Sequence, residues 1–460
     1  MLRSLRMRLR HRLRRGPLAL AGLLSVALAA APMAFAQERP TSADDELAPP
    51  NVRVSIAQGS GARALGMGGA FLARPDDGTA ASWNPAGLSY LQRLEVSAAG
   101  LMTSAHSTGV ETTGLLFNDD HLKATTVDFV STAFPFENKY VSGAAQLSYQ
   151  RAIPFGGERR IARSVVRHIE LDTKGGFDLI AAGVGLRLSR SLRFGVTVNR
   201  WVNGYEANFS RRHEFDATSM DAEVQERDIT LNGLNMHFGA IWSPLPDDKL
   251  NFGIVGKTPF DGTASLWRRR RDFNPDVEPE NKELWLHGLN LRFPGTVGVG
   301  TSWRIASALT ASVDYTRTFW SDASITGYFQ LNARDATIFD RPVAFPDTSI
   351  ETEQEDTEQI RMGLEYVLFL GKVKCPLRVG YYNDKQYFRT DDPDPLRPGG
   401  DDGPAPRFNA ITAGTGIAAG KVLFDMAYVR ERGRYYDGLT RATTAHRVYM
   451  SVIFRYAGRY

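Results

Sequence analysis

The feature that most constrains this chain is a recurring alternation of apolar and other residues with a period of two. It is clear in Leu192–Asn199, in Leu309–Thr316 and in Val422–Val429. Successive side chains of a β-strand point to opposite faces, so each segment predicts a strand with one apolar face. Helical periodicity is scarce, and beyond the first residues no apolar run is long enough to span a bilayer as a helix. The alternation therefore predicts an all-β fold.

The first 36 residues have the three parts of a secretory signal peptide. Seven arginines form a basic head, Pro17–Ala31 is apolar, and Ala34-Phe35-Ala36 supplies the small residues of a cleavage site. We expect the mature chain to begin at Gln37. The pair Arg14-Arg15 leaves export by the twin-arginine route as an alternative. An uncleaved anchor helix is a further alternative, although the apolar run is short for the ~20 residues that a spanning helix needs.

A soluble β-sandwich would show the same alternation, but three features favour a transmembrane antiparallel β-barrel over residues 92–460. Many strand-like segments exceed the five or six residues that are usual in globular sheets. Aromatic residues such as Trp242, Trp303 and Tyr381 stand near segment ends. Short turns such as Pro244–Asp248 alternate with long polar stretches, as in barrels with short periplasmic turns and longer external loops. We therefore expect a multi-pass barrel in the bacterial outer membrane.

The strand count follows from the same pattern. Strand-like segments begin near residues 94, 124, 140, 177, 192, 229, 250, 284, 296, 309, 359, 373, 408 and 422, and a last one covers His446–Tyr456. Because single-chain bacterial barrels have even strand numbers, we expect about fourteen strands, one of the fifteen candidates being a loop hairpin or part of a split strand. Four stretches are predicted as loops: 156–173, for which a short hairpin is the alternative, 210–228, 332–358 and 390–407.

A Gly- and Ala-rich segment, Gly59–Leu91, lies between the signal and the first strand. Its small residues predict close packing, so we expect residues 37–91 to form a plug, or hatch, inside the lumen. The residues expected to pack this plug are Gly66, Gly68, Gly69, Phe71, Asp76 and Asp77. The turn Asn84-Pro85-Ala86-Gly87 is a candidate hinge, because Pro fixes φ, Gly permits positive φ and Asn caps turns.

These motifs together resemble the FadL/TodX family of outer-membrane transporters for long-chain fatty acids and other hydrophobic compounds. The resemblance rests on Gly66–Phe71, Asp76-Asp77 and Asn84–Leu88, and on later segments such as Phe252–Phe260 and Phe293–Gly300. It implies a plugged fourteen-stranded barrel through which a hydrophobic solute passes before leaving sideways into the bilayer. It also implies a kink in the third strand, for which Ser142, Gly143 and Ala144 are the candidate positions.

The sequence leaves a second function open. Gly66–Phe71 is also similar to PorV-like barrels, which act in protein secretion or surface attachment. Passive uptake of hydrophobic compounds is the leading prediction. Its partners would be a hydrophobic small molecule, outer-membrane lipids and the barrel assembly machinery, whose aromatic end signal the last strand resembles.

Other chemistries lack support in the sequence. No zinc, dinucleotide or nucleophile-elbow motif occurs, so we predict no enzyme, no cofactor and no metal site. The net charge of +4 depends on the signal arginines, which removes support for a nucleic-acid partner. Cys375 is expected as a small wall residue, the acidic stretch 390–402 as a solvated loop in preference to a calcium site, and Trp267–Arg271 as a solvated charge run in preference to a phosphate-binding one.

Overall fold

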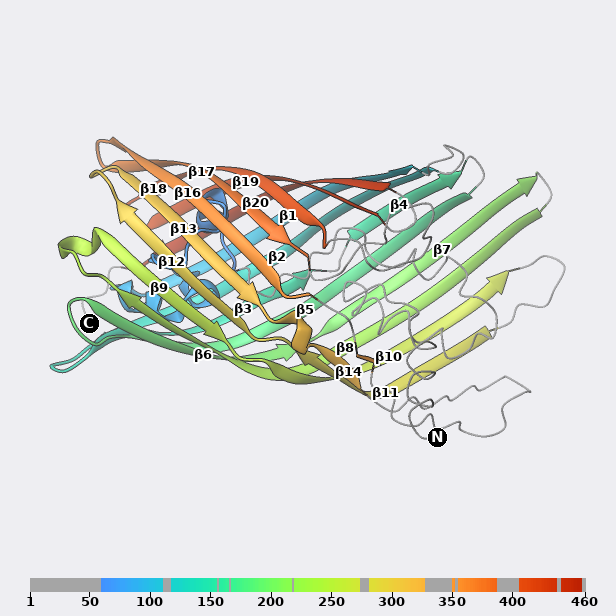
Figure 1. Ribbon diagram of the computed structural model, residues 1–460, viewed down its shortest axis with the longest axis horizontal. Helices are drawn as coiled ribbons and strands as arrows, with labels where there is room; N and C mark the ends of the chain where they lie inside the picture. The colour runs from blue at the N-terminus through green and yellow to red at the C-terminus, as the bar shows by residue number, and fades with distance from the viewer. Residues whose placement is uncertain are drawn as a thin grey trace, which may run out of the picture.

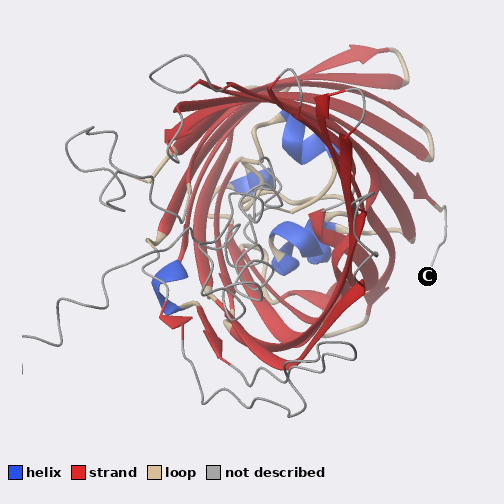
Figure 2. Ribbon diagram, turned by 90° about the vertical axis from the view of Figure 1, so that its right-hand side faces the viewer, coloured by secondary structure: helices blue, strands red, loops and turns tan. Residues whose placement is uncertain are grey.

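The computed structural model is a closed antiparallel β-barrel with a short helical segment inside it (Figures 1 and 2). It describes residues 59–110, 117–154, 157–164, 167–216, 219–273, 281–326, 350–351, 355–386, 405–436 and 440–456. The predicted signal peptide, residues 37–58 of the predicted plug and most of the two acidic loops lie outside these ranges. No helix in the described ranges is long and apolar enough to cross a membrane.

The described residues form twenty strand segments. The first ten are β1 (Glu95–Val110), β2 (Phe117–Glu137), β3 (Ser142–Pro154), β4 (Gly157–Ser164), β5 (Arg167–Arg187), β6 (Leu192–Val202), β7 (Gly204–Asp216), β8 (Ser219–Trp242), β9 (Leu250–Lys257) and β10 (Phe260–Phe273). The others are β11 (Asn281–Phe293), β12 (Thr296–Arg304), β13 (Leu309–Thr318), β14 (Ser324–Thr326), β15 (Ile350–Glu351), β16 (Thr357–Leu370), β17 (Val373–Lys385), β18 (Arg407–Ala419), β19 (Val422–Tyr436) and β20 (Thr440–Arg455).

These segments make fourteen wall strands, because six wall strands consist of two segments each: β3/β4, β6/β7, β9/β10, β11/β12, β13/β14 and β15/β16. Each strand pairs antiparallel with the next, and β1 pairs with β20 to close the barrel. The predicted fold class and strand number are confirmed. The fifteenth candidate is explained by β11/β12, where Pro294-Gly295 divides one wall strand into the segments predicted at 284 and 296.

The two ends of the barrel differ. At one end, turns such as 188–191 and 371–372 join neighbouring strands directly, whereas the opposite end carries the long connections and the projecting hairpins β7/β8 and β10/β11 (Figure 1). The stretch 210–228, predicted as a loop, is one of these hairpins. Its charged residues therefore do not prevent strand formation.

The period-two pattern places apolar side chains on the outside. On β16, for example, Ile360, Met362, Leu364 and Tyr366 are exposed, and the residues between them are buried in the lumen or against the inner segment. An apolar outer face on a closed barrel satisfies every backbone group without presenting polar groups to lipid. The protein is therefore a bacterial outer-membrane β-barrel.

Candidate functional site

Residues 59–91, here called the inner segment, lie within the barrel toward the end with the short turns (Figures 1 and 2). They form α2 (Ala62–Gly66), α3 (Ala80–Trp83) and the 3-10 helix η2 (Pro85–Tyr90). Helices this short have little intrinsic stability in water, so their structure depends on contacts with the wall. Nearly all of their side chains are buried.

Asn84 joins the inner segment to two wall strands. Its Oδ1 accepts a hydrogen bond from the Ala86 N–H at 3.1 Å, and its Nδ2 donates to the Leu72 carbonyl at 2.9 Å. Nδ2 also lies 3.4 Å from the Ala240 oxygen on β8 and 3.3 Å from the Ile254 oxygen on β9. Asn84 therefore caps η2 and fixes it against the wall at once.

The wall supplies glycines where the turn Asn84–Gly87 approaches it. A Cβ on Gly239 would lie 1.9 Å from the Asn84 Oδ1, and one on Gly195 would lie 2.3 Å from the Pro85 carbonyl carbon. Within the turn itself, a Cβ on Gly87 would meet the Pro75 oxygen at 2.2 Å. Close packing against the backbone explains why glycine stands at positions 87, 195 and 239. The role of Asn84–Gly87 as a hinge stays a prediction.

The glycines Gly66, Gly68 and Gly69 bring the backbone of the inner segment against β16, β17 and β18. Gly68 has a φ of +67°, and a Cβ there would lie 2.8 Å from the carbonyl oxygens of Met362 and Tyr381. Its N–H donates to the Thr412 Oγ1 at 3.0 Å, and that hydroxyl donates to the Gly66 carbonyl, also at 3.0 Å. Small residues are thus required on both sides of this contact.

Phe71 begins a further contact with β13. The N–H groups of Phe71 and Leu72 donate to the same carboxylate oxygen of Asp314, at 2.6 and 2.8 Å. The Phe71 ring packs edge-on against Trp83, with ring centroids 6.1 Å apart. Sequence reasoning singled out Phe71 but missed Asp314, which lies more than 240 residues away.

The two acidic residues of the inner segment, Asp76 and Asp77, differ in their main contacts. Asp77 accepts hydrogen bonds from the N–H and hydroxyl of Thr79, at 2.9 and 2.6 Å, and so fixes the turn into α3. Asp77 also lies 3.5 Å from Nη1 of Arg63, whereas Asp76 lies closer to this nitrogen, at 2.7 Å, and 3.3 Å from Nε of Arg74. Burial raises the pKa of Asp76, but Arg63 and Arg74 more than offset this, so that the pKa is lowered overall.

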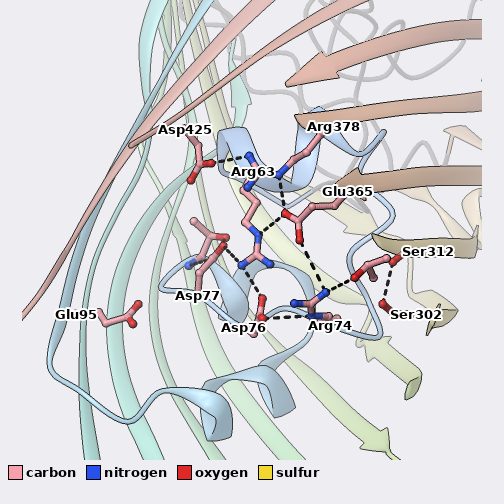
Figure 3. Close-up of polar contacts among 12 residues, drawn as sticks. Arg63, Arg74, Asp76, Asp77, Glu95, Ser302, Ser312, Glu365, Arg378 and Asp425 are labelled. Atoms are coloured by element: carbon pink, nitrogen blue, oxygen red, sulfur yellow. Dashed lines mark hydrogen bonds and ion pairs between the residues drawn. The ribbon is translucent and has the colours of Figure 1, made fainter. Parts of the chain in front are cut away.

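Two arginines extend this contact into a network with the wall (Figure 3). Arg63 Nε lies 3.4 Å from the Glu365 Oε2 on β16, and Arg378 on β17 lies 2.8 Å from the same oxygen. Arg378 also lies 2.6 Å from Asp425 on β19. Three wall strands are thereby tied to the inner segment by buried, charge-assisted hydrogen bonds. Sequence reasoning assigned no role to Arg63, Arg378 or the two wall carboxylates.

The wall itself is interrupted between its second and third strands. β2 pairs with β3 from Phe129↔Gln150 to Glu137↔Ser142, and with β4 from Asp119↔Ala162 to Lys123↔Glu158. Residues 124–128 of β2 have no ladder partners on that side, and the β3–β5 register shifts between Arg151 and Ile153. The predicted kink positions, Ser142–Ala144, lie several residues away, where pairing with both neighbours is regular.

The inner segment reaches the interruption through Asp128. This β2 residue is buried, and its Oδ2 accepts a hydrogen bond from the Gly61 N–H at 3.3 Å. The first described turn of the inner segment therefore rests against the unpaired stretch of β2.

A group of stacked aromatic rings lies on the lumen side of the interruption. Trp201, Phe260 and Phe293 are buried, with ring centroids 4.7–5.6 Å apart. The Trp201 Nε1 donates to Asn235 at 3.2 Å. A cavity of about 20 Å³ beside them is lined by Gln150, Ala152, Leu179, Trp201, Asn235, His237, Lys257, Phe260, Pro294 and Thr296. We call this cavity and its lining the aromatic chamber. Gln150 and Ala152 belong to β3 at the interruption, so the chamber and the interruption are adjacent.

Known structures share the overall fold of this barrel. The chain superposes on a FadL homologue from Pseudomonas aeruginosa with a TM-score of 0.57 and 11% identity, over 86% of this chain and 98% of that one. The fold is that of the FadL/TodX channels. It also matches the Pseudomonas putida toluene transporter TodX, with a TM-score of 0.54 and 11% identity over 88% and 100% of the two chains.

A third match of the FadL/TodX type is the toluene transporter TbuX of Ralstonia pickettii, with a TM-score of 0.55, 14% identity and 87% and 99% coverage. No family model and no curated protein matches the sequence. At these identities the likeness establishes the fold, and the predicted resemblance is confirmed at that level. The substrate has to be argued from this chain's own residues.

Proposed function

We propose that this FadL/TodX-type barrel takes up hydrophobic compounds across the outer membrane and releases them sideways through the interruption between β2 and β3. The observation that carries the proposal is the adjacency of the aromatic chamber and this interruption. The proposal includes residues 1–36 as a signal peptide, 37–91 as the plug and 92–460 as the barrel.

The chamber suits a flat apolar solute. Three parallel or nearly parallel rings offer faces on which a further ring can stack at favourable separations. The cavity of about 20 Å³ holds little more than one water, so a solute must displace neighbouring side chains to enter. Two of the lining residues have polar ends. Lys257 carries its ammonium group on a long, flexible side chain, and Thr296 carries its hydroxyl on a small one.

The interruption suits an exit into lipid. A greasy solute gains nothing from an aqueous pore, because leaving water is what drives it into an apolar phase. Unpaired strand edges are costly in the bilayer unless they face a sheltered space. At residues 124–128 the inner segment contacts this edge, where the Gly61 N–H donates to the Asp128 carboxylate at 3.3 Å. In the proposal the inner segment belongs to the plug, and its movement would open this space to the bilayer.

Uptake of labelled toluene and labelled oleate tests the function in cells that lack other hydrophobic-uptake barrels. The variants are Trp201→Ala, which removes a chamber ring, and Trp242→Ala, which removes an exposed ring of the lipid-facing surface. We expect the protein to raise uptake, Trp201→Ala to abolish most of the rise, and Trp242→Ala to retain it. Toluene should be affected more than oleate.

Equal uptake with and without the protein, for both solutes, would contradict the proposal. A pull-down for a bound protein would then test the PorV-like alternative. If both tryptophan variants raised uptake equally, the protein would still be a transporter, but the solute would not pass through the aromatic chamber.

A further inference from the structure

Three arginines face outward from the loop-side half of β19. Arg430, Arg432 and Arg434 are all exposed, and the residue between the first two, Glu431, is buried in the lumen. Nearer the short turns the same face of β19 is apolar, with Val422, Phe424, Met426 and Tyr428 each 37–43% exposed. A single strand therefore changes from apolar to strongly basic on its outer face between Tyr428 and Arg430.

This change coincides with the outer edge of the membrane. From Val422 to Tyr428 the strand runs about 20 Å at ~3.4 Å per residue, which a tilt of about 35–45° reduces to about 15 Å of height. The apolar band of such barrels is about 25 Å tall. The arginines therefore lie in or above the outer part of that band, on the side that carries the long connections. At this depth the lipid headgroups, rather than bulk water, are the nearest neighbours.

Neighbouring strands extend the basic surface. Arg432 pairs with Asn409, two residues from the exposed Arg407 of β18. In the other direction, Arg430 pairs with His446 of β20, His446 with Ser104 of β1, and Ser104 with the exposed Lys123 of β2. We call Arg407, Arg430, Arg432, Arg434 and Lys123 the basic belt.

The arginines of β19 differ from Lys123 in their acidic neighbours. Lys123 stands directly opposite the exposed Glu158 of β4. In the described ranges no ion pair involves Arg430, Arg432 or Arg434, and Glu431 points inward to Arg447, 3.3 Å away. Arg317, on β13 four wall strands away, lies 2.8 Å from Asp356. The barrel thus neutralises an outward arginine elsewhere but leaves three together on β19. Three guanidinium groups together on an outward face can bind an anionic group from outside the chain.

We propose that the basic belt binds the phosphate groups of the phosphorylated glycolipid in the outer leaflet of the outer membrane. Guanidinium groups match phosphate oxygens with paired hydrogen bonds, and outward side chains on one strand repeat every second residue, so several donors reach one headgroup. The acyl chains of the same molecule would lie on the apolar face below, at Val422–Tyr428. This binding is independent of what the barrel transports.

The test measures retention of glycolipid by the full-length protein in detergent, using native mass spectrometry. The probes are a bis-phosphorylated glycolipid, its dephosphorylated form with the same acyl chains, and inorganic phosphate. The variant is Arg430→Gln/Arg432→Gln/Arg434→Gln. The matched control is Arg93→Gln/Arg187→Gln/Arg190→Gln, which removes the same charge from exposed positions at the short-turn end. Heat-dependent gel mobility confirms that each barrel is folded.

We expect the protein to bind the phosphorylated lipid about tenfold or more tightly than the dephosphorylated one, with a similar loss in the β19 variant and none in the control. Inorganic phosphate at millimolar concentration should compete poorly, because it lacks the acyl chains. Equal binding of the two lipids by the unaltered protein would overturn the proposal even if the β19 variant failed to fold. Equal losses in the variant and its control would overturn it as well, since they would show a general charge effect. If free phosphate bound as tightly as the lipid, the belt would be an anion site and not a lipid site.

Discussion

Arg63 and Glu365 are 302 residues apart in the chain, yet the Arg63 Nε lies 3.4 Å from the Glu365 Oε2. This contact joins the inner segment to the wall, and Arg378 approaches the same oxygen from the next strand. Glu365 is therefore a carboxylate shared between the inner segment, which moves in our proposal, and the wall, which does not. Loss of its charge should release the inner segment and leave the strand pairing of the wall intact.

The first prediction concerns this carboxylate. Glu365→Gln removes the charge that balances Arg63 and Arg378, and breaking a buried ion pair in this way costs about 3–5 kcal/mol. We expect more frequent channel openings in planar bilayers and faster proteolysis of the inner segment. Glu137→Gln, at an exposed position on β2, is the control. Identical conductance of the two variants would show that Glu365 does not hold the inner segment.

The second prediction concerns Asn84. Asn84→Ala removes the cap of η2 and leaves buried carbonyl groups without their donor, which costs about 1–3 kcal/mol. Limited proteolysis should cut the inner segment of this variant sooner than that of the unaltered protein. Asn232→Ala, on the exposed face of β8, should be cut at the unaltered rate. A protected inner segment in Asn84→Ala would mean that the wall glycines hold it without the asparagine.

The third prediction separates backbone strain from close packing at Gly68. Both Gly68 and Gly371 have positive φ, +67° and +62°, but a Cβ on Gly371 would meet no atom within 4 Å. Gly371→Ala should cost only the ~1–2 kcal/mol of the left-handed backbone. Gly68→Ala should cost more, because its Cβ would also collide with two carbonyl oxygens. Thermal unfolding of the two folded barrels, compared directly, measures the difference. Equal midpoints would rule out the collision.

The fourth prediction is a pH dependence set by Asp76. Its pKa is lowered from the ordinary value of 3.8, so the folded state binds its proton more weakly than the unfolded state does. The stabilisation it gives is therefore complete above about pH 4 and is lost as the pH falls through the lowered pKa. Docking of the inner segment, followed by protease resistance, should be the same at pH 7 and pH 5 and should weaken only below pH 4. Asp76→Asn should weaken docking at pH 7 and flatten this acid dependence. A loss of protection already at pH 5 would assign the effect to another group.

The fifth prediction tests the sideways exit. Ala152 lines the aromatic chamber on β3 beside the interruption, so Ala152→Trp should fill the passage and reduce toluene uptake by about tenfold. Ala182→Trp places the same ring on the exposed face of β5 and should leave uptake unchanged. Normal uptake by Ala152→Trp would place the exit elsewhere, while leaving uptake itself established.

Sequence reasoning succeeded where the information is local. The alternation in Leu192–Asn199 and Val422–Val429 correctly predicted strands whose apolar face is outward, because side-chain direction in a strand depends only on position along it. It failed at 210–228, where charge suggested a loop and the structure has a hairpin of two paired strands. It identified Gly68 and Phe71 but neither Thr412 nor Asp314, because nothing near residue 68 specifies which of fourteen strands passes beside it.

By itself, the sequence determined an antiparallel barrel of about fourteen strands, its apolar exterior and a small-residue segment able to pack inside it. Each follows from residue type and spacing over a few positions. Only the tertiary structure decided that Arg63 meets Glu365, that the pairing of the second and third wall strands is interrupted beyond Gln150, and that Arg432 lies near Arg407 of the neighbouring strand on the outer face. A period of two fixes the face of each side chain, whereas these relationships depend on the register between strands and on closure of the barrel, which couple residues hundreds of positions apart.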